Sequence, residues 1–536
     1  MTAPRVAALW RPALLIAGSA IFVWLIAASS VIVSGGVISN DLSSYLAPAV
    51  AMLRGTGAPY TGYFDIKPPG LIFLFVPWVA VFGRSMPSLV ALDVLLLGGN
   101  LAMFWLVLRR VAPPLVRDAV YVASVGIVAC LGSFGGMVLL SEPIGSLLLL
   151  VAFWVALRFP SRAAGFLVIG ATCALASQVK EVWVFSVLPF ALLALADRRS
   201  TRRTLPALAA GWLGMIGLLA AGLMAVGALG AYGDVLRYKA GLFPLPGIRS
   251  TVVATGQTMV AEASRLFLLA AVLPLAIAVT LAVRSRAEGV RHALGRLAGV
   301  GSGSLWLAFL VWVSLIPAFV WQAKPLAEHY FLALFLPFMV VVGGALAYLV
   351  DAWAPSGASR GRLAAVGLVV VLALLPSGDA VAGLADRGTE LAAVEAVLPF
   401  PAMETPAELA VYAAATSHLR GSDCLQVVYH WEAGAAYVYT GAEPCSRYFL
   451  ANLLTTPATQ AEYRRDLVAR PPAVLIYQAT DVELDVAAFE RTVFPYANVI
   501  AACYVSTDNP SVFVARYDAG EQSRCIGAQL AAFGAG

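Results

Sequence analysis

Long apolar segments alternate with short polar stretches over roughly the first 380 residues of the chain. Segments this apolar and this long are typical of helices that cross a bilayer. We predict about 11 spans, at residues 13–34, 87–108, 116–137, 143–158, 164–179, 182–196, 205–229, 262–283, 303–321, 330–350 and 363–377. The first segment is too long for the apolar part of a secretory signal, so we expect an uncleaved helix.

The pattern changes near residue 383 to that of a soluble α/β domain. Strand-like runs at residues 425–429, 436–440, 473–477, 499–505 and 512–517 alternate with helix-like runs near residues 391, 407, 463 and 489. The sequence therefore predicts a transmembrane domain at residues 1–382 and a soluble α/β domain at residues 383–536. The second domain has no glycine-rich nucleotide motif, which argues against a nucleotide site.

Composition and charge support a multi-pass membrane protein. The chain has 536 residues, 60% hydrophobic and 12% charged, whereas a soluble domain has about 25% charged residues. Arginine clusters fall in alternate loops, which predicts that those loops and the N-terminus are cytoplasmic. An odd number of spans then places the C-terminal domain outside. The net charge of +5 reflects this bias, and without a basic stripe carrying aromatics we expect no nucleic-acid partner.

Four cysteines lie in the predicted external domain: Cys424, Cys445, Cys503 and Cys525. Outside the cytoplasm they are predicted to form two disulfides, for which three pairings are open. The alternative is four reduced, buried thiols. No C-x-x-C motif occurs, so we expect no structural zinc site.

Residues 39–83 combine acids, a lysine and aromatics between two apolar segments. Asp41 opens a helix-like run at residues 42–54, and turn residues with Tyr60 follow it. Asp65 and Lys67 come next, and Pro68, Pro69 and Gly70 stop any helix. The apolar run at residues 71–82 is shorter than the roughly 20 residues that a span needs. We therefore predict an interfacial or re-entrant segment there.

This stretch resembles the first external loop of the GT-C glycosyltransferases, in the branch of the lipid A aminoarabinose transferase and the protein O-mannosyltransferases. The matching residues are Asp41, Tyr45, Arg54, Gly55, Pro59, Tyr60, Asp65 and residues 67–70. In that family the loop carries the catalytic acid and lies against a polyprenyl-phosphate sugar. The resemblance implies a GT-C fold with about 11 spans and juxtamembrane helices in this loop, in the bacterial inner membrane. Residues 429–432 and 446–448 also resemble the tail of bacterial members, without a role that we can assign.

Two acids are the candidate catalytic residues. The resemblance makes Asp41 the base, although with Asn40 it is also suited to cap the helix that follows. Glu142 is expected to orient the acceptor or sugar, because the family has an acid there that faces the active site. The structural alternative is a favourable acid in a first helical turn, with Pro143 at the first position.

The chain contains four lysines, and the predicted topology places all of them on the external side. A departing phosphate needs positive charge at that face. We predict that Lys67, Lys180 and Lys324 bind the donor phosphate. The remaining substrate-binding candidates are Tyr45, Tyr60, Asp65, Lys239, Arg249, His329 and Tyr330.

Two later loops supply the last of these candidates. The His329–Tyr330 pair resembles the family's entry to a late helix, although interfacial belts also use these residue types. The loop at residues 232–265, with Lys239 and Arg249, is predicted to be a mobile segment that gates the acceptor.

The expected reaction is transfer of a sugar from a polyprenyl-phosphate carrier to a hydroxyl of a lipid, glycan or protein acceptor. A single displacement implies inversion at the anomeric carbon. No cofactor is required; a divalent ion on Asp41 is an option in the wider superfamily, but nothing in this sequence demands one. The alternatives are a transporter or flippase for lipid-linked sugars, and an O-antigen ligase or polymerase. No internal repeat, which many transporters have, is apparent between the halves of the chain.

Overall fold

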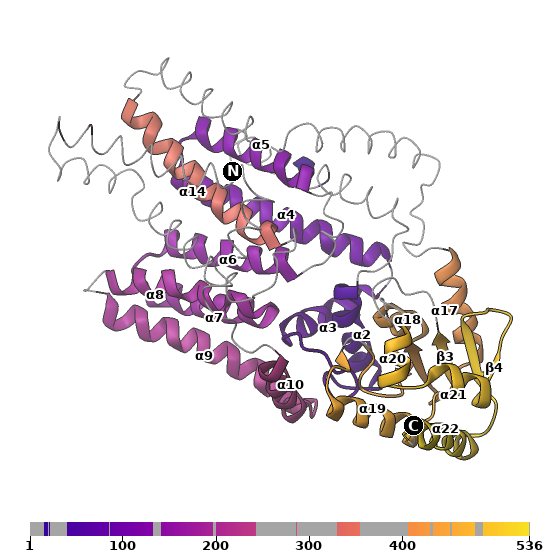
Figure 1. The fold of residues 1–536 in the computed structure, drawn as a ribbon. Coiled ribbons are helices and arrows are strands. Elements are labelled where there is room, and N and C mark those ends of the chain that lie inside the picture. The colour runs from indigo at the N-terminus through magenta and orange to yellow at the C-terminus, as the bar shows by residue number, and fades with distance from the viewer. Residues whose placement is uncertain are drawn as a thin grey trace. The chain divides into compact units, whose positions relative to one another are not determined.

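The computed structural model describes residues 15–19, 21, 40–84, 86–131, 141–196, 200–242, 283, 286, 330–353, 406–428, 433–450, 453–477 and 486–534. The chain forms two compact units (Figure 1). Unit 1 comprises Met1–Val31, Val90–Leu219 and Pro244–Pro399, and unit 2 comprises Ile32–Leu89, Ala220–Phe243 and Phe400–Gly536. We describe each unit by itself. The predicted domain boundary at residues 382–383 lies outside the described residues.

The described part of unit 1 is helical. Its elements are α4 (Met86–Val111, which begins in unit 2), α5 (Pro114–Leu131), α6 (Ser141–Arg158), α7 (Ala163–Val179), the 3₁₀ helix η1 (Glu181–Ser186), α8 (Val187–Ala196), α9 (Thr201–Ala225, which ends in unit 2) and α14 (Tyr330–Trp353). Helices α6 and α7 pack together, and α14 packs on α5 and α6. Large side chains such as Trp183, Tyr121 and Phe104 are completely buried among them.

Glycines let two of these helices approach closely. A Cβ at Gly170 of α7 would lie 2.0 Å from the carbonyl oxygen of Leu208, and one at Gly211 of α9 would lie 2.0 Å from that of Leu167. Small residues on both sides therefore bring the α7 and α9 backbones into contact, as they do where helices cross in membranes.

Only two of the described helices are long and apolar enough to cross a membrane: Ala91–Val111 within α4, and Thr201–Ala225. The prediction of a polytopic protein with about 11 spans is therefore wrong. Helices α7 and α8 have 17 and 10 residues, and a 17-residue helix rises about 26 Å, less than the roughly 30 Å of a bilayer core. One part of their apolar residues, such as Phe166 and Phe190, is buried in the helical core, whereas others, such as Leu167 and Leu192, are exposed. The predicted spans at 13–34, 262–283, 303–321 and 363–377 lie wholly or almost wholly outside the described residues.

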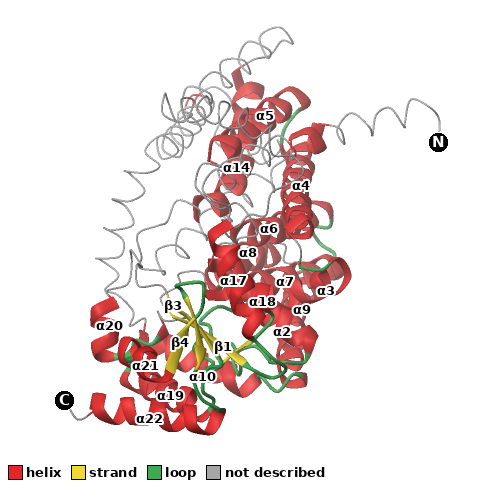
Figure 2. Ribbon diagram, turned by 90° about the vertical axis from the view of Figure 1, so that its right-hand side faces the viewer, coloured by secondary structure: helices red, strands yellow, loops and turns green. Residues whose placement is uncertain are grey.

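Unit 2 is built around a β-sheet, drawn in yellow in Figure 2. The sheet has five strands in the order β2-β1-β3-β5-β4. The strands are β1 (Cys424–Val428), β2 (Glu443–Pro444), β3 (Val474–Tyr477), β4 (Tyr504–Ser506) and β5 (Val512–Ala515). β2, β1 and β3 are parallel, and β5 and β4 are antiparallel to their neighbours. Leu425 lies opposite Val474, which lies opposite Val514, so apolar residues follow one another across the sheet.

Unit 2 also contains eight of the described helices with eight or more residues. They are α2 (Asn40–Arg54), α3 (Gly70–Phe82), α10 (Leu229–Leu242), α17 (Pro406–His418), α18 (Ala433–Thr440), α19 (Pro457–Ala469), α21 (Tyr496–Cys503) and α22 (Ala519–Gly534); the short α20 (Val486–Thr492) completes the set. Helix α17 packs on β3 and β5, and α18 packs on both β1 and α2. The N-terminal segment that holds the candidate site is therefore part of the same unit as the C-terminal sheet.

Two predicted strands are helices. Residues 436–440 belong to α18, and residues 499–503 belong to α21, with only Tyr504 and Val505 in a strand. A short apolar run does not distinguish a buried helix from a buried strand, and the alanines in both segments favour a helix. The predicted strands at 425–429, 473–477 and 512–517 correspond to β1, β3 and β5.

Candidate functional site

Helix α2 carries the first residues of the site, and its position is set by α18. A Cβ at Gly434 of α18 would lie 2.4 Å from the Ser43 Oγ atom, so the two helices touch there without room for a side chain. Leu42 and Leu46 are buried, as are Ser44 and Tyr45. This packing fixes the orientation of Ser44 and Tyr45 relative to the turn that follows α2.

That turn contains a strained tyrosine. Tyr60 has φ 65°, a value that costs a non-glycine residue free energy and persists only where surrounding contacts enforce it. Its backbone N–H donates to the Tyr63 carbonyl at 2.9 Å, and its hydroxyl donates to the Lys67 carbonyl at 2.8 Å. Its ring packs on that of Tyr232, with centroids 4.9 Å apart. Tyr60 therefore braces the backbone at Lys67.

The Lys67 side chain returns to α2. Its Nζ atom donates to the Ser44 Oγ atom at 2.6 Å and lies 4.8 Å from the centroid of the Tyr45 ring. Its backbone N–H donates to the Asp65 Oδ1 atom at 3.2 Å, and the Asp65 carboxylate is buried. An ammonium, an aromatic face and a carboxylate thus share one small region.

A second ammonium reaches the same turn from α10. The Lys239 Nζ atom donates to the Ile66 carbonyl at 3.2 Å. The neighbouring Tyr238 donates its hydroxyl to the Leu453 carbonyl at 2.6 Å, and its ring lies 5.4 Å from that of Phe64. Of the loop at residues 232–265 that we predicted to gate the acceptor, residues 232–242 belong to helix α10, whose Tyr238 and Lys239 are held by other segments. Residues 243–265 lie outside the described part of the chain.

Arg447 and Tyr448 contact the same turn at Phe64. The Phe64 backbone N–H donates to the Arg447 carbonyl at 2.7 Å, and the Arg447 guanidinium lies 5.1 Å from the Phe64 ring. Arg447 forms an ion pair with Glu462 at 2.8 Å, and the Tyr448 hydroxyl donates to Glu462 at 2.8 Å. Burial alone would lower the pKa of Arg447, but the hydrogen bond to Glu462 raises it. Burial also raises the pKa of Tyr448 to about 12.

The sequence contained only a weak signal for this cluster. Residues 446–448 match the tail of the resembling family, but nothing in the local pattern shows that Arg447 contacts a phenylalanine almost 400 positions earlier. An arginine next to a tyrosine, two residues after a cysteine, was the available hint.

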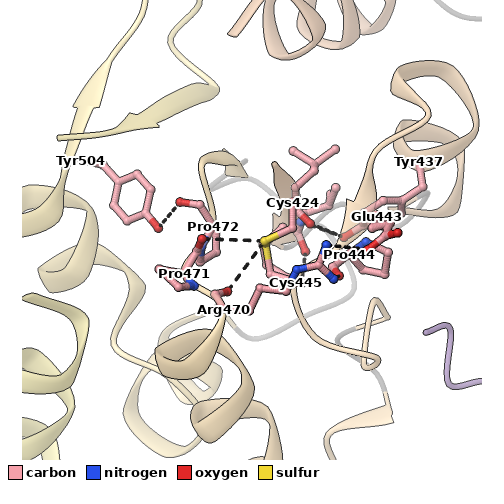
Figure 3. The surroundings of a disulfide bond; sticks show 12 residues. Cys424, Tyr437, Glu443, Pro444, Cys445, Arg470, Pro471, Pro472 and Tyr504 are labelled. Atoms are coloured by element: carbon pink, nitrogen blue, oxygen red, sulfur yellow. Dashed lines mark hydrogen bonds and ion pairs between the residues drawn. A yellow bond between two sulfur atoms is a disulfide. The ribbon is translucent and has the colours of Figure 1, made fainter. Parts of the chain in front are cut away.

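A disulfide precedes this cluster. The structure pairs the cysteines as Cys424–Cys445 and Cys503–Cys525. Figure 3 shows Cys424–Cys445, which joins β1 to the residue that directly follows β2. Arg470 lies beside it and forms an ion pair with Glu443 at 2.5 Å. The residues after Cys445 therefore start from a covalently fixed point.

Six of the predicted site residues belong to unit 2. The contacts described above join five of them: Tyr45, Tyr60, Asp65, Lys67 and Lys239. Asp41 is the second residue of α2, one helical turn before Tyr45. Glu142 lies in the first turn of α6, Lys180 directly follows α7, and Tyr330 begins α14; all three belong to unit 1. Arg249, Lys324 and His329 lie outside the described residues.

In the part of the chain that the structure describes, no group of three or more histidine, cysteine, aspartate or glutamate residues is arranged to hold a metal ion. The five gathered residues instead offer two ammonium groups, two phenol rings and one carboxylate. This combination is suited to an anionic group attached to a body with both polar and apolar faces.

Comparison with known proteins gives no match: no protein-family model matches the chain, and no curated protein does.

Proposed function

We propose that the chain transfers a sugar from a polyprenyl-phosphate carrier to a hydroxyl group of an acceptor at a membrane surface. The observation that carries this proposal is that two ammonium groups belong to one short segment: Lys67 supplies its own ammonium, and the Lys239 ammonium donates to the carbonyl of the preceding residue, Ile66. Lys67 is additionally placed between a hydroxyl and an aromatic ring of α2. Two cations at one turn favour a ligand that carries a phosphate.

Helix α3 supports a lipid-borne phosphate over a soluble one. It begins three residues after Lys67 and has 13 residues, none of them charged. One side is buried, with Leu71 and Phe75, while Val81 and Phe82 are 72% and 58% exposed. An uncharged helix with an exposed apolar side is typical of a segment that lies in a membrane interface. A phosphate bound at Lys67 would then have its polyprenyl chain next to α3.

The chemistry follows from these positions. The acceptor oxygen forms a bond to the anomeric carbon while the bond from that carbon to the phosphate oxygen breaks. The acceptor proton passes to the carboxylate of Asp41, and the carrier leaves as a polyprenyl phosphate anion. Lys67 and Lys239 stabilise the charge that develops on the leaving oxygen. The displacement inverts the anomeric configuration.

Asp41 is proposed as the base from the family resemblance; its position in α2 is one turn before Tyr45, whose ring lies under the Lys67 ammonium. The roles of Glu142 and Lys180, which belong to unit 1, stay predictions. These two residues enter the proposal from the sequence, and the five gathered residues of unit 2 are its structural support.

The test is transfer by the purified full-length chain in detergent, given a polyprenyl-phosphate sugar labelled in the sugar. Release of polyprenyl phosphate that depends on an acceptor, and that is lost in both Asp41→Asn and Lys67→Ala, supports the proposal. Donor movement across reconstituted vesicles without any release would instead make the protein a transporter. If the protein binds the donor but neither releases polyprenyl phosphate nor moves the donor across the membrane, both the transferase and the transporter functions are refuted.

A further inference from the structure

The two lysines of the site lie on segments that contact the C-terminal part of unit 2, Phe400–Gly536, which we call the C-terminal domain. Phe64, three residues before Lys67, is the point of contact for Lys67. Its ring packs on Tyr448 with centroids 4.9 Å apart and lies under the Arg447 guanidinium. Its backbone N–H donates to the Arg447 carbonyl. Both the backbone and the side chain of Phe64 are therefore fixed by one dipeptide.

That dipeptide is itself rigidly held. Arg447 and Tyr448 both bind Glu462 of α19, and Arg447 also donates to the Tyr448 hydroxyl at 3.1 Å. Ser446 donates to Asp466, one turn further along α19, at 2.7 Å. The disulfide at Cys445 fixes the start of the segment. The three residues thus form a rigid platform on α19 on which Phe64 rests.

Lys239 is connected to the same domain by a separate route. Tyr238 donates its hydroxyl to the Leu453 carbonyl and also shares a hydrogen bond of 2.8 Å with the Thr455 hydroxyl. Residues 453–455 lie between the platform and α19 in sequence. The orientation of α10 at Lys239 therefore depends on a second contact with the C-terminal domain.

We propose that the C-terminal α/β domain is the positioning element of the site, with Arg447 placing Lys67 through Phe64 and residues 453–455 placing Lys239 through Tyr238. Arg447 is a positioning residue, because it acts on the turn and not on the reacting atoms. The inference rests on the proposed function only in its statement that the two lysines bind a phosphate. The placement itself is independent of any reaction.

The placement predicts distinct effects on the two ammonium groups. Loss of the Arg447 side chain removes the cation over Phe64 and leaves Glu462 without its cationic partner. The turn at residues 64–67 then moves more freely, and Lys67 spends less time on Ser44. Loss of the Tyr238 hydroxyl removes the hydrogen bonds of α10 to residues 453–455 but keeps the ring beside Phe64, so the effect falls on Lys239.

Lysine acylation of the full-length chain reads this out directly, because only four lysines are present and each gives its own peptide by mass spectrometry. Without any donor, we expect Arg447→Ala to raise the acylation rate of Lys67 about two- to fivefold, the factor for losing one cation–π contact while the backbone bond to Phe64 remains. We expect Arg447→Lys to give a smaller increase, since it keeps the charge for Glu462 but not the planar stack. Tyr238→Phe should raise the rate at Lys239 and leave that at Lys67 unchanged.

The matched control is Arg464→Ala. Arg464 lies on α19 two residues from Glu462, donates to the carbonyls of Thr492 and Val493 at 2.6 Å each, and lies over the ring of Phe533. It tests the effect of loosening α19 without touching the turn. Unchanged Lys67 labelling in Arg447→Ala and Arg447→Lys would overturn the inference. So would an equal increase in Arg464→Ala, since that would show general loosening.

A second arm separates this inference from the proposed function. Polyprenyl phosphate is added to the wild-type chain before acylation, with inorganic phosphate as the comparison. Absence of protection at Lys67 refutes the phosphate assignment, whereas the result with Arg447 variants in the absence of lipid decides the positioning. Protection of Lys67 in the wild type that is reduced in Arg447→Ala supports both.

Discussion

Replacement of Lys67 by methionine is the sharpest test of the site. Methionine keeps an unbranched apolar stem and removes the ammonium, which donates to the Ser44 Oγ atom at 2.6 Å and lies 4.8 Å from the Tyr45 ring centroid. A hydrogen bond to a charged group contributes about 1.5–3 kcal/mol. If the same ammonium binds the donor phosphate, Lys67→Met should weaken donor binding by about 10- to 150-fold.

The rate of transfer should fall with the affinity. Charge on the leaving oxygen grows toward the transition state, so the lost contact is worth more there than in the bound ground state. Single-turnover transfer from a labelled polyprenyl-phosphate sugar separates the two effects. The dependence of the rate on donor concentration gives the donor affinity, and the rate at saturating donor gives the transfer step. Lys67→Arg should recover only part of the rate, since the planar guanidinium is bulkier than a compact ammonium.

The control is Arg524→Met on α22, which removes one positive charge from the same unit at a side chain that is 78% exposed. It should bind donor and turn over as the wild type does. If Lys67→Met also retains the wild-type donor affinity and rate, Lys67 is not a phosphate ligand and the reasoning from the convergence of lysines is wrong. A loss of equal size in both variants would point to bulk charge and not to the site.

Three further predictions concern catalysis and stability. Asp41→Asn should lower single-turnover transfer by about 100- to 10,000-fold with little change in melting temperature, because asparagine keeps the size of aspartate and α2 is held by its packing on α18; near-normal turnover would remove Asp41 from the mechanism. The disulfide Cys424–Cys445 spans a sequence separation of 21, so a Cys424→Ser/Cys445→Ser double variant should lose about 3 kcal/mol of stability in thermal or denaturant unfolding; unchanged stability would show that the platform does not need its covalent anchor. Burial raises the pKa of Asp466, so the folded protein binds this proton more tightly than the unfolded chain does. The contribution of Asp466 to the free energy of unfolding therefore falls as the pH rises above about 4. In Asp466→Asn the melting temperature should therefore fall less with rising pH in that range, because asparagine does not titrate but its amide oxygen still accepts the hydrogen bond from Ser446. An unchanged dependence of the melting temperature on pH would contradict this.

Local pattern was enough to locate many elements of the chain. The helix-like run at residues 42–54 is α2, and the apolar run at 71–82 is α3, bounded by Pro69 and Gly83. β1, β3 and β5 lie where apolar runs with β-branched residues predicted them. These elements were predictable because proline, glycine and side-chain period act over a few residues.

The same reasoning failed where the burial of a segment decided its structure. Apolar runs between residues 143 and 196 predicted membrane spans, but they form helices of 18, 17 and 10 residues with a short 3₁₀ helix between the last two. Hydrophobicity measures how unfavourable a segment is in water, and burial in a helical core removes apolar surface from water as insertion into lipid does. Residues 436–440 show the same ambiguity on a smaller scale, since they pack on α2 as a helix and not in the sheet.

For the candidate site, the sequence by itself determined the residue types and the constraint on the turn. Lys67 stands between an acid and two prolines, and the order of the residues alone establishes that. Only the tertiary structure decided that Lys239 joins the same turn, that α18 sets the position of α2, and that Arg447 holds Phe64. These contacts join residues hundreds of positions apart, and side-chain packing between separate elements leaves no periodic trace in any one segment.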